Sequence, residues 1–86
     1  MSDVMSTLRP LVARVAQHPA DDITADSNFK RFASWGSLAA MRLLANVEQT
    51  YHVQLDLRSY MKLETVGQLA TEIADRLGTA AAAHAG

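Results

Sequence analysis

The sequence predicts an all-α fold: a four-helix bundle with a short third helix and a long loop between the first and second helices. The 86 residues form one domain, and a chain this short buries only a small core. Hydrophobic residues make up 49% of the chain, but many of them are alanine and only five residues are aromatic. Apolar residues recur at helical spacing in separate segments. A helical bundle fits these observations best.

The first helix is predicted from residue 4 to the neighbourhood of His18. The residue before a proline is disfavoured in the helical conformation, so His18-Pro19 marks the end. Pro10 lies inside this segment and leaves two possibilities. The regular helix begins near Thr7 with Pro10 in its first turn, or it bends at Pro10. The apolar positions of this helix are Val4, Leu8, Leu11, Val12 and Val15.

Residues 19–36 are predicted to form a long ordered loop. The segment has no sustained apolar period and is rich in Asp, Ser, Thr and Asn, which favour turns. Its apolar residues should hold the loop against the bundle, and long loops in compact domains are usually functional or disordered. The expected anchors are Ile23, Phe29, Phe32 and Trp35.

The second helix is predicted from Ser37 to about Tyr51, without an internal Gly or Pro. On a helical wheel its core face contains Ala40, Leu43, Leu44, Val47 and Tyr51. Nearly opposite lies a smaller apolar strip of Leu38, Met41 and Ala45, flanked by Arg42. The core does not explain this strip, so it suggests a face for docking a partner.

The remaining sequence predicts a connector and a last helix. Residues 52–63 contain the anchors Val53, Leu55 and Tyr60, with a short helix near 57–61. Thr65 and Gln68 form a capping-box pattern, and the last helix is expected to end at Gly78. Residues 1–78 would then be the folded domain and residues 79–86 a disordered, alanine-rich tail.

Composition excludes several functions. The net charge is −1 with mixed signs, which disfavours nucleic acid and anionic membranes as partners. The predicted helix that begins at Ser37 contains one Arg and no Lys. It would therefore neutralise too few phosphates to bind DNA. The absence of cysteine excludes disulfides and thiol catalysis by the chain itself. No apolar run is long enough for a bilayer and no signal peptide is visible, so a cytoplasmic location is expected.

Ser37 has two interpretations. It is either the N-cap of the second helix, a common role for serine, or an exposed chemical handle at a loop-to-helix corner. If Ser37 were the nucleophile of a hydrolase, a general base would have to lie within hydrogen-bond reach of its hydroxyl. His52 lies roughly 22 Å away along a continuous helix, and His18 and His84 are no better placed. The three histidines are also too scattered for a metal site.

The stretch "DSNFKRFASWGSLAAMRLLANVEQTYHVQLDLRSYMKLETVGQLATEI" resembles an acyl or peptidyl carrier protein. The resemblance covers residues 26–74, with a Phe eight residues before the serine and an aromatic residue fourteen after it. It implies that Ser37 receives 4′-phosphopantetheine from coenzyme A through a phosphopantetheinyl transferase. The arm's thiol would then hold an acyl or aminoacyl thioester, supplied by a loading enzyme and used by downstream synthases. The chain would not itself be an enzyme, and it is expected to be a monomer.

The sequence departs from the family pattern around the serine. Gly36 occupies a position where the family usually has Asp, and Ala39 and Arg42 replace frequent acidic residues. This favours a stand-alone carrier of a polyketide or nonribosomal-peptide type pathway over a fatty-acid synthase carrier. An unmodified carrier-like interaction module is the alternative. The expected docking surface consists of Trp35, Leu38, Met41, Arg42, Arg58 and Met61.

Overall fold

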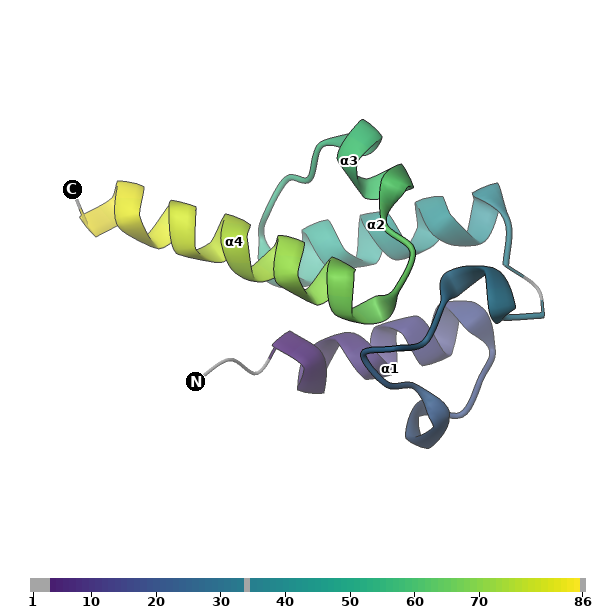
Figure 1. The fold of residues 1–86 in the computed structure, drawn as a ribbon. Helices are drawn as coiled ribbons and strands as arrows, with labels where there is room; N and C mark the ends of the chain where they lie inside the picture. The colour runs from purple at the N-terminus through teal and green to yellow at the C-terminus, as the bar shows by residue number, and fades with distance from the viewer. Residues whose placement is uncertain (1–3, 34, 86) are drawn as a thin grey trace.

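The computed structural model describes residues 4–33 and 35–85, with side chains up to residue 78. Four α-helices follow in order: α1 (Val4–Ala16), α2 (Ser37–Tyr51), α3 (Leu57–Lys62) and α4 (Val66–Ala85). Two short 3₁₀ helices, η1 (Ala20–Asp22) and η2 (Phe29–Arg31), lie between α1 and α2. The described residues contain no strand, so the predicted all-α bundle is confirmed (Figure 1).

Helix α1 packs against both α2 and α4, and their apolar faces form the core (Figure 1). Leu8, Leu43 and Ile73 are completely buried within it. The predicted core face of α2 is confirmed at Ala40, Leu43, Leu44 and Val47. Tyr51 is only half-buried, and its hydroxyl donates a hydrogen bond to the Val4 carbonyl at 2.8 Å, which joins the end of α2 to the start of α1.

Pro10 lies inside α1, because the helix is already formed at Val4. The possibility that the regular helix begins near Thr7 is therefore wrong. Proline has no N–H, so the Ser6 carbonyl loses its usual helical donor at this turn. The helix ends at Ala16, two residues before His18, where Gln17 adopts a left-handed φ of 55°. The His18 N–H then donates to the Ala13 carbonyl at 3.0 Å, a common way to close a helix.

The long loop is held in place by the start of α4. The N–H groups of Val66 and Gly67 donate to the carbonyls of Ser27 (2.9 Å) and Ala25 (2.8 Å). In return the Phe29 N–H donates to the Glu64 carbonyl at 2.9 Å. A side chain at Gly67 would place its Cβ 2.8 Å from the Ala25 oxygen, so only glycine allows this approach. The loop is thus ordered, as predicted, although it also contains two 3₁₀ turns.

Hydrophobic anchors fix the loop and the connector on the bundle. Trp35 is half-buried, whereas the other predicted anchors, Ile23, Phe29, Phe32, Val53, Leu55 and Tyr60, are buried. The connector is also held by Glu48, whose carboxylate accepts the Leu55 N–H at 3.0 Å. The short third helix is confirmed as six residues, α3. Its N-cap is Asp56, whose carboxylate accepts the Ser59 N–H at 3.0 Å.

The capping box of α4 is confirmed, but the predicted helix end at Gly78 is wrong. The Gln68 N–H donates to Thr65 Oγ1 at 3.1 Å, and Gln68 Oε1 accepts the Glu64 N–H at 2.7 Å. The helix continues through Gly78 to Ala85 and projects beyond the other helices (Figure 1). Gly78 does not adopt a positive φ, and alanine, which dominates the following residues, is the best helix former. That residues 79–86 lie outside the folded domain stays a prediction.

Candidate functional site

Ser37 is the first residue of α2 and is exposed. The N-cap is Gly36, which has an extended backbone (φ −160°) and gives the helix no side-chain cap. The interpretation of Ser37 as the cap is therefore wrong. No residue that the structure describes bonds to the Ser37 hydroxyl. This hydroxyl is therefore not held by another described group, and the space beside Gly36 is open, since a Cβ there would meet nothing within 4 Å.

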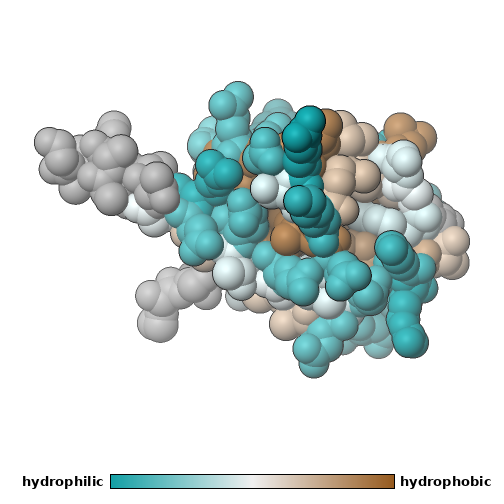
Figure 2. Space-filling view, turned by 45° about the horizontal axis from the view of Figure 1, so that its top comes forward, coloured by the Kyte–Doolittle hydropathy of each residue, from teal (hydrophilic) through white to brown (hydrophobic). Residues whose placement is uncertain are grey.

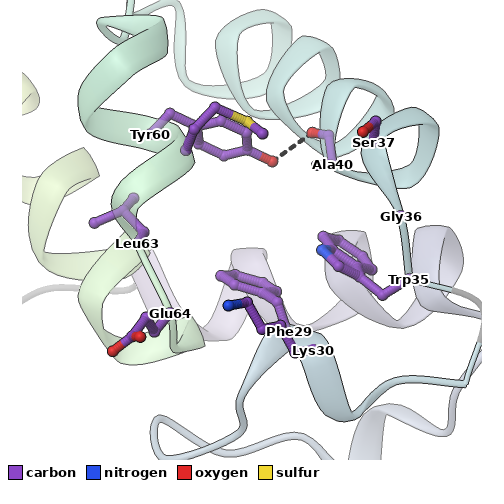
Figure 3. A pocket seen from close by; sticks show the side chains of 10 residues that line it. Phe29, Lys30, Trp35, Gly36, Ser37, Ala40, Tyr60, Leu63 and Glu64 are labelled. Carbon is purple, nitrogen blue, oxygen red and sulfur yellow. Dashed lines mark hydrogen bonds between the residues drawn. The ribbon is translucent and has the colours of Figure 1, made fainter.

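A pocket of about 280 Å³ opens beside Ser37, between α2, α3 and the long loop (Figure 3). Its walls are largely apolar, and three of the five aromatic residues of the chain line it. Lys30 and Glu64 bring one charge of each sign and are both exposed. The lining residues are Phe29, Lys30, Trp35, Gly36, Ser37, Ala40, Tyr60, Met61, Leu63 and Glu64.

The aromatic walls are fixed by packing and hydrogen bonding. Phe29 and Trp35 are stacked, with ring centroids 5.1 Å apart and planes at 17°. Phe29 is further held by the bond of its N–H to Glu64. Across the pocket, the Tyr60 hydroxyl donates to the Ala40 carbonyl on α2 (Figure 3). Burial raises the pKa of Tyr60 well above its ordinary value, so this hydroxyl stays neutral and remains a donor.

The predicted docking residues divide into two groups. Trp35 and Met61 line the pocket together with Ser37. Leu38, Met41 and Arg42 are exposed on α2 outside it, and Arg58 is exposed on α3.

Large apolar side chains remain on the surface near this site. Leu38 is 67% exposed and Met61 52%, which leaves unburied apolar area on both α2 and α3. Figure 2 shows one face of the molecule where hydrophobic side chains reach the surface among hydrophilic ones. Leu57, 49% exposed, belongs to this set and was not predicted. The sequence shows only a leucine directly after the cap residue Asp56, and its exposure becomes visible only in the structure.

Hydrolytic and metal chemistry find no support in the geometry. His52 caps the far end of α2, in a left-handed conformation, and the length of the helix separates it from Ser37. The His18 ring packs on Phe32 with centroids 5.4 Å apart. The side chain of His84 lies outside the described residues. Within residues 4–33 and 35–78, no group of three metal-ligating side chains is present.

No helix in the described part of the chain is long and apolar enough to cross a membrane.

Comparison with known proteins agrees with this geometry. The family model described as "phosphopantetheine attachment site" matches residues 6–79. No curated protein is significantly similar. Among solved structures, the holo acyl carrier protein of Geobacter metallireducens has the same fold, with a TM-score of 0.79 at 24% identity, over 91% of this chain and 90% of that one.

Proposed function

This chain belongs to the phosphopantetheine attachment family, and we propose that Ser37 is the residue that carries its 4′-phosphopantetheine arm. The single observation that carries this assignment is the free, exposed hydroxyl of Ser37 at the start of α2, beside the pocket. The hydroxyls of Ser27 and Ser59 are already engaged. Ser27 accepts the Thr24 N–H, and Ser59 donates to Asp56. The residues present therefore fit the group.

The chain presents the nucleophile and a transferase does the chemistry. The Ser37 oxygen attacks the phosphorus atom of coenzyme A that bears the pantetheine. A P–O bond forms, adenosine 3′,5′-bisphosphate leaves, and the hydroxyl proton passes to a base of the transferase. The attached arm supplies a thiol, which the chain itself lacks, and holds cargo as a thioester. No described residue bonds to the Ser37 hydroxyl, so the transferase supplies the base that takes its proton.

We place the docking surface for partner enzymes on the exposed residues of α2 and α3. Leu38, Met41 and Arg42 lie within the first two turns after the arm, and Arg58 and Met61 lie on α3. Trp35 lies at the edge of this surface.

The charge of α2 supports a partner set different from that of carriers with an acidic second helix. The only acidic residue of α2, Glu48, is half-buried and turned to the Leu55 N–H. A basic enzyme surface would therefore find no free carboxylate there, whereas Arg42 would attract an acidic one. This favours a specialised pathway of polyketide or nonribosomal-peptide type. That the chain is monomeric and cytoplasmic stays a prediction from the sequence.

The test uses a broad-specificity phosphopantetheinyl transferase with coenzyme A, and then with an acyl-coenzyme A. The expected product carries one arm, and the acyl group on it is released by neutral hydroxylamine, as a thioester is. Loss of modification in Ser37→Ala, with modification retained in the matched variant Ser59→Ala, would support the assignment. A wild-type chain that takes no arm would instead favour the unmodified interaction module, for which the missing carboxylate at Gly36 is the supporting observation.

A further inference from the structure

Aromatic rings line the pocket beside Ser37 on two sides. Phe29 and Trp35 present stacked rings on one side, and the Tyr60 ring lies across from them (Figure 3). Leu63 and Met61 complete the apolar lining. Aromatic rings prefer offset stacked or edge-to-face contact with another ring. An aromatic ring would therefore gain ring–ring contacts with these walls that an alkyl chain cannot make.

The size of the pocket limits its occupant. A closed apolar cavity of about 150 Å³ holds one benzene molecule. The pocket here measures about 280 Å³ and is open on one side. One aromatic ring with a small substituent fits this space.

One aromatic wall of the pocket carries a hydrogen-bond donor that could bind an occupant. The Tyr60 hydroxyl is occupied by the Ala40 carbonyl. In contrast, the indole nitrogen of Trp35 faces the pocket (Figure 3), and no acceptor for its N–H exists among the described residues. A donor covered by an occupant without an acceptor loses its bond to water, which is unfavourable. The occupant should therefore bring an oxygen to Trp35.

We infer that the cargo of this carrier is a planar aromatic acyl group bearing a ring oxygen, which folds back into the pocket and accepts the Trp35 indole N–H. The inference rests on the proposed attachment of the arm to Ser37. It assigns the class of cargo, which the family membership leaves open.

The experiment compares matched acyl groups on the holo-protein. A broad-specificity transferase attaches benzoyl, cyclohexanecarbonyl, or 2-, 3- or 4-hydroxybenzoyl phosphopantetheine from the corresponding acyl-coenzyme A. Benzoyl and cyclohexanecarbonyl have the same number of ring carbons, but only benzoyl is planar. Intact mass of the wild type and of Ser37→Ala first establishes that each group is on Ser37. The half-life of each thioester against hydrolysis is then divided by the half-life of the same acyl group on free pantetheine. This ratio measures how far the protein protects the thioester.

The benzoyl thioester should be protected roughly two- to tenfold more than the cyclohexanecarbonyl thioester, as one additional stacked aromatic contact predicts. The best hydroxybenzoyl group should be protected more than benzoyl, and Trp35→Phe, which keeps a ring but removes the N–H, should abolish that difference. Trp35→Leu should reduce protection of every aromatic group.

Equal protection of benzoyl and cyclohexanecarbonyl on correctly modified protein would overturn the inference and leave the proposed function intact. A Trp35→Phe protein that keeps the hydroxybenzoyl advantage would overturn the role of the indole N–H. Failure of the wild-type chain to accept any arm would overturn the proposed function, and the inference with it.

Discussion

The hydroxyl of Tyr60 on α3 donates a hydrogen bond to the backbone carbonyl of Ala40, three residues after Ser37 on α2 (Figure 3). Tyr60 is only 5% exposed, so the bond is shielded from water. The contact ties the shortest helix to the helix that bears the serine, and it forms one wall of the pocket. Tyr60 is therefore one of the contacts that hold α3 beside Ser37.

Tyr60→Phe should lower the free energy of unfolding by about 1 kcal/mol, the usual net contribution of one hydrogen bond. The change should also alter the fluorescence of Trp35, the only tryptophan, since both residues line the pocket. Tyr51→Phe is the matched control, because it removes a hydroxyl bonded to Val4 at the other end of α2. Denaturant titration followed by fluorescence measures both effects. A Tyr51→Phe protein with the same spectral change would contradict this role of Tyr60.

Gly36→Asp should stabilise the protein by a few tenths of a kcal/mol, because Asp caps a helix better than Gly. The backbone at Gly36 is extended and a Cβ there meets nothing, so no strain opposes the change. We also expect faster modification by transferases adapted to Asp at this position. Gly36→Asn separates the two effects, since it provides the cap without the charge. If the Asp and Asn variants are modified equally fast, the negative charge is not what the transferase requires.

Asp56 should make α3 sensitive to acid. Its hydrogen bond from the Ser59 N–H lowers the pKa of the Asp56 carboxyl below the ordinary 3.8. The stabilisation is therefore fully present above pH 3.8 and is lost as the pH falls through the lower, folded-state pKa. Asp56→Asn, which keeps a helix cap without a titrating group, should flatten this acid limb of a stability–pH curve. An identical acid limb in the Asp56→Asn protein would count against this assignment.

Met41→Ala should slow loading of the holo-protein by its cognate enzyme, and Arg42→Glu should slow it further if the partner surface is acidic. Both side chains are exposed on α2, so the thermal melt should change little, with stability effects within about 0.5 kcal/mol. Loading rate and melting temperature are measured together. Unchanged loading in both variants would move the docking surface to α3, around Arg58 and Met61.

Much of the fold was predictable because local sequence signals agree with the packing. The apolar period from Ser37 to Tyr51 predicts both the helix and its buried face. The Thr65 and Gln68 pair predicts a capping box that the structure contains. The end of α4 was not predictable from Gly78, because glycine ends a helix only where the backbone turns left-handed. Here it does not, and the helix continues.

The pocket could not be predicted from the sequence. Phe29 and Tyr60 were recognised as anchors, but their convergence with Trp35 depends on backbone bonds between distant segments. The bond from the Phe29 N–H to the Glu64 carbonyl is one of these, and no side-chain pattern encodes it. The state of Ser37 was equally hidden, because a shift of one residue in the helix start decides whether the serine caps the helix or stays free.

The intact mass of the protein after incubation with coenzyme A and a phosphopantetheinyl transferase tests the central claim most directly. The account predicts the mass of one phosphopantetheine added to the wild type and to Ser59→Ala, and none added to Ser37→Ala. Circular dichroism of Ser37→Ala should show the helical spectrum of the wild type, because the Ser37 hydroxyl makes no bond to a described residue. A folded Ser37→Ala protein that still gains the arm would contradict the account.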